Sequence, residues 1–474
     1  MSSNGTRSRA SAAVASASSS SYITSTNFRA NASTATGPGI ATATATATSN
    51  SAIPRSMPST SSRHHDVLIP QQLNNILQSD KFVKTHFSSL GFDFLRLESY
   101  RRFKHLLFVG GGGIIKEVVY DITTFIRKEL TDSKSESSKK LKDFLSSNNA
   151  LLEDEDPFIS SDQQLQLRHW LYIIFGYLSQ SYNDKEVEKF LDKIIDIYMD
   201  SRNKTMLLPE ISNKQDQFSL NLLKEYFNDA RINYNALYSK KQKPFITFYE
   251  AAPGKIYLPP LPKIYNKELL VKALMHREYY RLLLVPQHPF AKELVANGYE
   301  DLNHKDYLVL KYELSFLDGL GDLFLAHETS RLIYELCKDT NKVVNNNTYQ
   351  LLRIILATNT LLSKLTVAYN LHKGLNDQVI QQIIRSEYLP HLYTGQLHPE
   401  RDAVETRIYE EEFLGDYFEC YMAALLIEQP QVAEKFISDI YSEILRVITV
   451  VLPPQITYKN WTTGILGRSL YHKN

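Results

Sequence analysis

Two pairs of acidic residues interrupt the most apolar stretches of this 474-residue sequence. Asp318 and Asp322 stand four residues apart in a run of Leu and Phe, so a helix would place them on one face, one turn apart. Asp416 and Glu419, three residues apart, repeat the pattern in a second apolar segment. Like charges at these spacings repel each other, and burial makes them costlier. A divalent cation would stabilise such a cluster, and Mg²⁺ (with Mn²⁺ as the substitute) is expected because hard cations bind carboxylate oxygens.

Two glycines make the first acidic segment a still poorer helix. Gly319 and Gly321 lie between the two acids of the first pair, and each lowers helix stability by about 1 kcal/mol relative to Ala. A segment with these residues is not optimised for helix stability alone, so the four acids are predicted to form a site. Two other interpretations stay open: the acids could face solvent on amphipathic helices, or they could pair with nearby Lys and Arg.

The elements that must position these acids are helices. From Asp66 onward, apolar residues recur at three- and four-residue spacing, which predicts an all-α fold. A Pro-rich connector at 246–263 separates a helical N-terminal domain at 66–245 from a second domain at 264–474. Helices are expected at residues 170–182, 184–200, 218–238, 267–284, 307–339, 348–373, 377–386, 405–428 and 431–451.

The first 65 residues have a different composition. They are rich in Ser, Thr and Ala and contain five Arg, no acid and no Leu. Such a segment has too little apolar surface to offset its ordering entropy, so a disordered tail is expected. An Arg-bearing, acid-free start is also typical of a transit peptide, and that alternative stays open.

Composition excludes several classes of protein. The chain has 53 basic and 52 acidic residues, which argues against a generically basic RNA-binding protein. Two cysteines, Cys337 and Cys420, are too few for a disulfide scaffold or a Cys-rich zinc module. No apolar run approaches the ~18 residues of a membrane span, so a soluble intracellular protein is expected. The glycine run at 110–113 lacks the Gly-Lys-Ser/Thr of a phosphate-binding loop, so no nucleotide cofactor is predicted.

Three motifs together resemble the ribonuclease III family. Leu-Asp-Gly-Leu-Gly-Asp-Leu-Phe-Leu at 317–325 is similar to the family signature Leu-Glu-Phe-Leu-Gly-Asp-x-x-Leu. Upstream, Leu-Leu-Val-Lys-Ala-Leu-Met-His-Arg-Glu-Tyr at 269–279 is similar to the opening helix of the family. Downstream, Gly-Asp-Tyr-Phe-Glu-Cys-Tyr-Met-Ala-Ala-Leu at 415–425 is similar to its later acidic motif. The resemblance covers about 264–449 and implies an RNase III-like helical endonuclease domain of the fungal type.

The resemblance also implies an activity and a site. It implies Mg²⁺-dependent hydrolysis of phosphodiester bonds in double-stranded or structured RNA, as in rRNA and other RNA processing. It assigns metal binding to all four acids and makes His276 structural. It further implies a homodimer through the signature helix, with the surface between Leu314 and Leu325 in the contact, and a nuclear location. The residues to which it assigns these roles are Asp318, Asp322, Asp416 and Glu419 as metal ligands, with Asp322 and Glu419 catalytic.

Departures from the family pattern support a second hypothesis. Leu314-Ser-Phe replaces the Asn-Glu-Arg that usually precedes the signature, and Glu412 stands where a Lys is expected. About 24 residues follow Val450, so no double-stranded RNA-binding domain is expected after it, and RNA would be recruited by the N-terminal helical domain or by a ribosomal or other protein partner. The alternative is a non-catalytic RNase III-fold protein that binds RNA and protein in the mitochondrial large ribosomal subunit.

Overall fold

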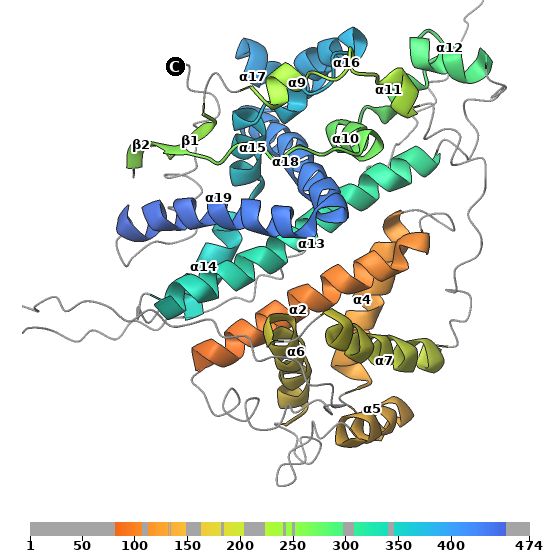
Figure 1. Ribbon diagram of the computed structural model, residues 1–474, viewed down its shortest axis with the longest axis vertical. Coiled ribbons are helices and arrows are strands. Elements are labelled where there is room, and N and C mark those ends of the chain that lie inside the picture. Colours follow the sequence, from red (N-terminus) through yellow and green to blue (C-terminus); the bar gives the residue numbers. More distant parts are fainter. Residues whose placement is uncertain are drawn as a thin grey trace, which may run out of the picture. The chain divides into compact units, whose positions relative to one another are not determined.

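The computed structural model describes residues 81–106, 112–130, 132, 134–147, 163–181, 184–202, 223–239, 243–248, 252–296, 308–339 and 346–451. All of them belong to one compact unit, residues 64–474. The all-α prediction is confirmed: helices dominate the described residues, which contain one two-stranded antiparallel hairpin besides (Figure 1). The predicted tail at 1–65 lies outside the described residues.

The described residues of the N-terminal half form five long helices. Its core is apolar, and the helix pair α2–α6 is closely packed: a Cβ on Gly91 of α2 would lie only 1.7 Å from the carbonyl oxygen of Tyr172 in α6. Gly is therefore required at this crossing. The elements are α2 (Lys81–Arg102), the short 3-10 turn η1 (Phe103–Leu106), α4 (Gly112–Lys128), α5 (Glu136–Ser147), α6 (Gln163–Ser181) and α7 (Asp184–Arg202).

A short hairpin and a Pro-rich segment lead into the C-terminal half. The strands pair antiparallel with Phe245 opposite Tyr257, a hairpin that was not predicted within the connector at 246–263, and residues 258–266 have no regular secondary structure. Asn266 caps that helix by accepting the N–H of Leu269. These elements are α9 (Tyr234–Leu237), β1 (Phe245–Phe248), β2 (Ala252–Tyr257), α10 (Lys267–Leu274), α11 (Tyr280–Leu283) and α12 (Pro289–Ala296).

The remaining elements form the second helical region. Long helices α13 and α18 run through it, and shorter helices and turns connect them (Figure 1). Both carry acidic residues in apolar sequence, as predicted. The elements are α13 (Leu308–Asp339), α14 (Asn346–Leu356), α15 (Asn359–Ala368), η4 (Leu371–Lys373), α16 (Gln378–Ile383), the π-turn η5 (Ile384–Tyr388), α17 (Pro390–Thr394), α18 (Ala403–Glu428) and α19 (Pro430–Val451).

Three predicted helices were wrong as continuous elements. The helix expected at 267–284 stops at Leu274, because Met275 adopts extended backbone and ends α10. The helix expected at 348–373 breaks before Asn359, where the Thr358 hydroxyl caps a new helix. Within 218–238, residues 223–226 are helical, turns and irregular backbone occupy 227–233, and α9 follows at 234–237. None of these breaks contains Gly or Pro, so the sequence offered no strong signal for them.

Among the described residues, no single helix is long and apolar enough to span a membrane, although α14 and α15 would meet the length and composition criteria if taken together across their 43° bend.

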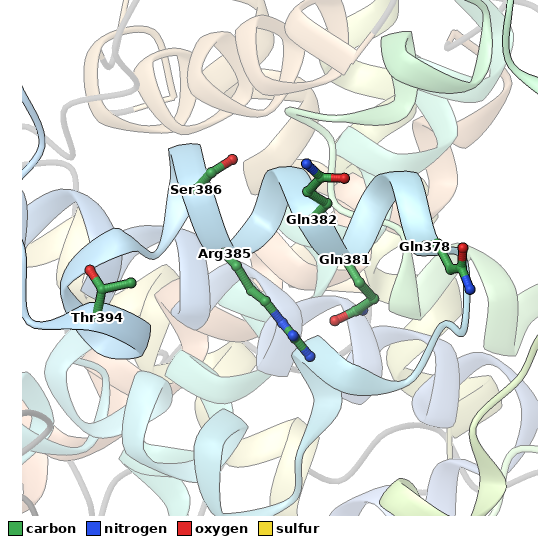
Figure 2. Close-up of a pocket in the computed structure, with 6 residues that line it drawn as sticks. All are labelled: Gln378, Gln381, Gln382, Arg385, Ser386 and Thr394. Carbon is green, nitrogen blue, oxygen red and sulfur yellow. The ribbon is translucent and has the colours of Figure 1, made fainter.

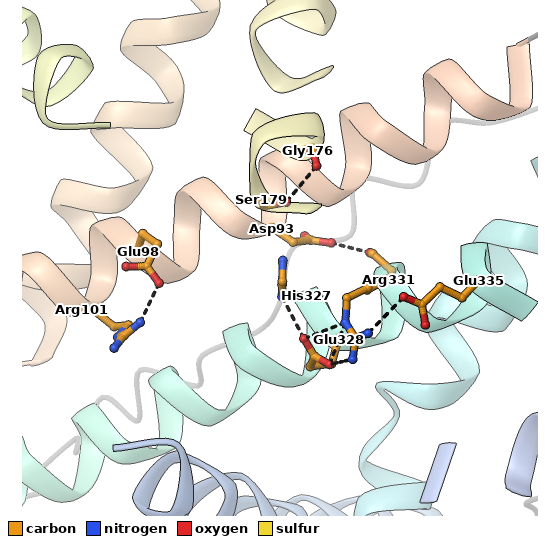
Figure 3. A network of polar contacts seen from close by, with 10 residues as sticks. Asp93, Glu98, Arg101, Gly176, Ser179, His327, Glu328, Arg331 and Glu335 are labelled. Carbon is orange, nitrogen blue, oxygen red and sulfur yellow. Dashed lines mark hydrogen bonds and ion pairs between the residues drawn. The ribbon is translucent and has the colours of Figure 1, made fainter. Parts of the chain in front are cut away.

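Helix α2 packs against α13 through polar as well as apolar contacts. Asp93 of α2 faces α13 (Figure 3) and accepts a hydrogen bond from the hydroxyl of Ser330 at 2.7 Å. The guanidinium of Arg353 in α14 donates to the same carboxylate. Nearer the N-terminus of α13, the rings of Tyr100 and Phe316 stack with centroids 5.1 Å apart. These contacts join the N-terminal half of the chain to the acidic helix.

The packing covers the surface that the resemblance assigned to a homodimer. Between Leu314 and Leu325, every residue except Ser315 and Asp322 is buried within this chain. Helices α2, α18 and α19 supply neighbours of α13. A homodimer contact over the whole of that stretch would therefore require rearrangement of these helices.

Candidate metal centre

Three of the four predicted site acids meet where α13 and α18 cross. Asp318 of α13 and Asp416 and Glu419 of α18 each offer a carboxylate oxygen, and these oxygens all lie within 4.8 Å of one another. All three residues are buried. The crossing is close because a Cβ on Gly321 would lie 2.0 Å from the carbonyl oxygen of Glu419. The glycine that weakens α13 is thus what lets α18 bring its acids to Asp318.

Asp322 is placed differently. It lies one turn beyond Asp318 on α13, and its side chain is exposed to solvent. Surrounding protein atoms, and next the charge of Asp318, raise the pKa of Asp322, while Arg96 opposes this. The structure therefore brings three predicted acids together in a buried group and leaves the fourth at its solvent-facing edge.

Burial shifts the ionisation of the three clustered acids. Burial, followed by the charge of Asp416, raises the pKa of Asp318 to about 6. Burial raises the pKa of Asp416 to about 7, although the Arg277 guanidinium opposes the shift. The pKa of Glu419 is raised well above its usual range by burial and by the neighbouring acids. With the described residues, Glu419 forms no hydrogen bond or ion pair. These carboxylates thus need positive charge to be fully ionised at neutral pH.

Arg277 supplies part of that charge. Its Nη1 lies 2.6 Å from Oδ2 of Asp318, and its Nη2 lies 2.9 Å from Oδ2 of Asp416. The guanidinium thus bridges the two helices. Burial works against the charged form, but Asp318 and Asp416 outweigh it and raise the pKa of Arg277. The interpretation that the acids pair with nearby basic residues is therefore correct for two of them.

His276 borders the cluster as a neutral, buried ring. The backbone N–H of Glu278 donates to Nδ1 at 3.0 Å, which assigns the ring proton to Nε2. Nε2 lies 3.1 Å from Oδ2 of Asp416, yet it has no hydrogen bond of good geometry within the described structure. Burial, followed by Arg277, lowers the pKa of His276 to about 3. His276 thus places a neutral ring beside Asp416 without a well-formed hydrogen bond to it.

Two basic residues of the N-terminal half also act on the site. Lys116 of α4 and Arg96 of α2 both stabilise the charged form of Asp322, and Lys116 does the same for Asp318. The Lys116 Cε would lie 3.3 Å from a Cβ on Gly319, so its chain runs beside the acidic segment. Sequence reasoning missed both residues because they lie about 200 positions before the acids and belong to no recognised motif.

Glu412, which stands where the family pattern has Lys, and the two glutamates before it have other roles. Glu410 is fully buried and accepts the backbone N–H groups of His391 and Leu392 at the start of α17. Glu411 accepts a hydrogen bond from the Thr360 hydroxyl at 2.7 Å. Glu412 is half-buried, and its charge contributes to the raised pKa of Asp416. Two of the three glutamates therefore hold neighbouring helices rather than contact the cluster.

A surface hollow away from the acid cluster is lined by uncharged polar residues and one arginine. It has a volume of about 430 Å³ and is formed by α16, η5 and α17 (Figure 2). The amide of Gln381 donates to the carbonyl oxygens of His372 and Leu375, so this side chain stabilises the local turn. The hollow contains no acid or histidine and shares no residue with the cluster. Its lining residues are Gln378, Gln381, Gln382, Arg385, Ser386 and Thr394.

The donor set of the cluster fits a hard divalent cation. Three carboxylates from two helices present oxygens close enough to share one ion, and an exposed acid stands at the edge where solvent or a phosphate could complete the coordination. Among the described residues Glu419 has no hydrogen bond or ion pair, so Arg277 does not pair with every acid of the group.

No family model matches the chain, and no curated protein matches it.

Proposed function

We propose that the chain is an RNase III-like, Mg²⁺-dependent endoribonuclease that cleaves double-stranded or structured RNA during RNA processing. One observation carries the proposal: Asp318, Asp416 and Glu419, at positions that match two of the three family motifs, lie with their ligand oxygens within 4.8 Å of one another. Acids from two distant motifs have no packing reason to be buried together, because each loses solvation there.

The chain's own residues divide the work as follows. Asp318, Asp416 and Glu419 would hold Mg²⁺, and Asp322 stands at the solvent edge, where it can orient water or substrate. When bound, Mg²⁺ supplies positive charge for the phosphate oxygens and a more acidic water. Nε2 of His276 lies 3.1 Å from an Asp416 oxygen, so this ring would help to hold that carboxylate in place.

Basic residues near the acids would bind the phosphates of RNA. Lys116 is exposed and runs beside Gly319, and Arg96 acts electrostatically on Asp322. Together they place positive charge from the N-terminal half at the solvent edge of the site, which supports recruitment of RNA by that half of the chain.

The test is cleavage of a long RNA duplex by the purified full chain, with Mg²⁺ and with EDTA. We expect Mg²⁺-dependent cutting that falls at least about a hundredfold in Glu419→Gln, because this variant keeps the shape but removes a ligand charge. The matched control is Glu443→Gln, which removes an exposed carboxylate of α19 that pairs with Arg446, and it should cut like the wild type. Absence of Mg²⁺-dependent cutting, or full activity in Glu419→Gln, would contradict the proposal.

A second candidate is supported by the ion pairs of Arg277. A guanidinium that already bridges Asp318 and Asp416 stabilises the fold without a metal, as a non-catalytic RNase III-fold protein of the mitochondrial ribosome would require. Under this alternative the protein binds structured RNA equally in Mg²⁺ and in EDTA and never cuts it. The same duplex assay, read out by both gel shift and cleavage, separates the two.

A further inference from the structure

We infer that Arg277 is an exchangeable counter-cation, which occupies the acid cluster when no metal is bound and competes with a divalent cation for the same carboxylates. This inference rests on the proposed function, because it concerns regulation of the same centre. It makes metal occupancy depend on the position of one side chain.

The contacts place the guanidinium where an ion would compete with it. Both of its terminal nitrogens lie on Oδ2 atoms, one of Asp318 and one of Asp416, at 2.6 and 2.9 Å. These two residues also belong to the group of three acids that could hold a cation. A metal ligated by the same acids would meet a like charge at close range, so the two cations exclude each other or weaken each other's binding.

The surroundings also offer the Arg277 side chain a second position, outside the acid cluster. Its side chain is 22 % exposed, so it reaches solvent at one end, unlike the acids it contacts. Its Nε lies 3.9 Å from Oε1 of Glu278, whose side chain is 52 % exposed. Glu278 is therefore an outer carboxylate that can receive the guanidinium when it leaves the inner pair.

The backbone favours such a movement. Arg277 lies in the turn between α10 and α11 and not within a helix, because α10 ends at Leu274 and α11 begins at Tyr280. The turn is anchored on both sides by Nδ1 of His276 and by the buried Tyr279, whose hydroxyl donates to the carbonyl oxygen of Leu274. A fixed backbone with a long side chain between two sets of carboxylates allows exchange by side-chain rotation alone.

The experiment measures Mn²⁺ binding to the full chain without RNA, by the electron paramagnetic resonance signal of free Mn²⁺. We expect Arg277→Gln to bind Mn²⁺ at least about tenfold more tightly than the wild type, since the competing charge is gone. Arg281→Gln is the matched control: this exposed arginine, four positions later, bonds to the Tyr280 hydroxyl and to no acid of the cluster, and its affinity should equal that of the wild type. Arg277→Lys should give an intermediate affinity, because an ammonium cannot bridge both carboxylates as the planar guanidinium does.

Further variants show whether the Mn²⁺ ion binds at the acid cluster. Asp416→Asn added to Arg277→Gln should abolish the tight binding, and retention of that binding would overturn the inference by placing the ion elsewhere. Equal Mn²⁺ affinity in the wild type, Arg277→Gln and Arg277→Lys would overturn the exchange but leave the proposed function intact if RNA is cut. Absence of binding in every variant would overturn both. If Arg277→Gln does not fold, the comparison of Arg277→Lys with the wild type decides.

Discussion

Two helix crossings in this molecule are equally close but are lined by different chemistry. At the α2–α6 crossing, Gly91 meets the backbone of Tyr172, and at the α13–α18 crossing, Gly321 meets the backbone of Glu419. The first is surrounded by apolar and aromatic side chains, whereas the second gathers buried carboxylates. The α2–α6 pair shows that this chain can pack helices tightly without acids. The acids at α13–α18 are therefore not explained by packing.

The largest effect on stability is expected from substitutions that prevent the close approach of the helices at each crossing. Gly91→Ala and Gly321→Ala should each lower the free energy of unfolding by about 3 kcal/mol, because each Cβ would overlap backbone that cannot move aside easily. Urea denaturation measures both. Gly415→Ala is the control, since its Cβ would meet only the Asn359 side chain, at 3.2 Å, and should cost less than about 1 kcal/mol. Wild-type stability in either crossing variant would show that the helices are not so closely packed.

A smaller effect is expected at a buried acid that does have partners. Asp93→Asn should lower the free energy of unfolding by about 2 kcal/mol, because the partly buried Arg353 guanidinium loses its counter-charge. Urea denaturation in EDTA tests this. Asp192→Asn removes an exposed acid that pairs with Arg102 and should change stability by less than about 0.5 kcal/mol. If the two variants are equally stable, the Asp93 network does not stabilise the α2–α13 contact.

The smallest effect is expected to have the opposite sign. Glu419→Gln should raise the free energy of unfolding in EDTA by about 1 kcal/mol at pH 8, because it removes a buried carboxylate that has no hydrogen bond or ion pair with the described residues. The folded-state pKa of Glu419 is raised, so the folded protein binds its proton more tightly than the unfolded chain does. Wild-type stability from this group is present at low pH and is lost as pH rises through the folded pKa. The gain in Glu419→Gln should therefore be larger at pH 8 than at pH 5 in thermal unfolding, and a gain that does not depend on pH would contradict this origin.

The long helices of the C-terminal half were predictable from the sequence, whereas α2, α4 and α5 matched no predicted range. The apolar pattern placed the helices at 307–339, 405–428 and 431–451 within about two residues of their observed ends. The two acid pairs were recognisable because carboxylates in apolar runs are costly, and this argument is local to each segment. In the structure three of the four acids lie together. The sequence motifs suggested this grouping but could not demonstrate it.

The neighbours of the acids were not predictable in the same way. Arg277 stands in a quoted motif, but its pairing with Asp318 and Asp416 depends on the chain turning at Met275, where no Gly or Pro marks a break. Lys116 and Arg96 reach the site only because α2 and α4 pack near α13, and no periodicity encodes that docking. A carboxylate in an apolar run can be recognised from the sequence around it. The basic residue that pairs with it, when distant along the chain, is known only from the tertiary structure.

The α13–α18 crossing joins residues that are far apart along the sequence, and this separation affects how easily its contacts form. Leu314 and Cys420 approach each other there although they are 106 positions apart, whereas Arg277 and Asp318 are separated by 41. Closing the longer loop costs more entropy, so the shorter contact is the easier one to form first. An early pair of Arg277 with Asp318 would present a half-neutralised surface to the incoming α18 and reduce the repulsion between its acids and those of α13. The guanidinium would then have served the assembly of the centre before any ion could compete for it.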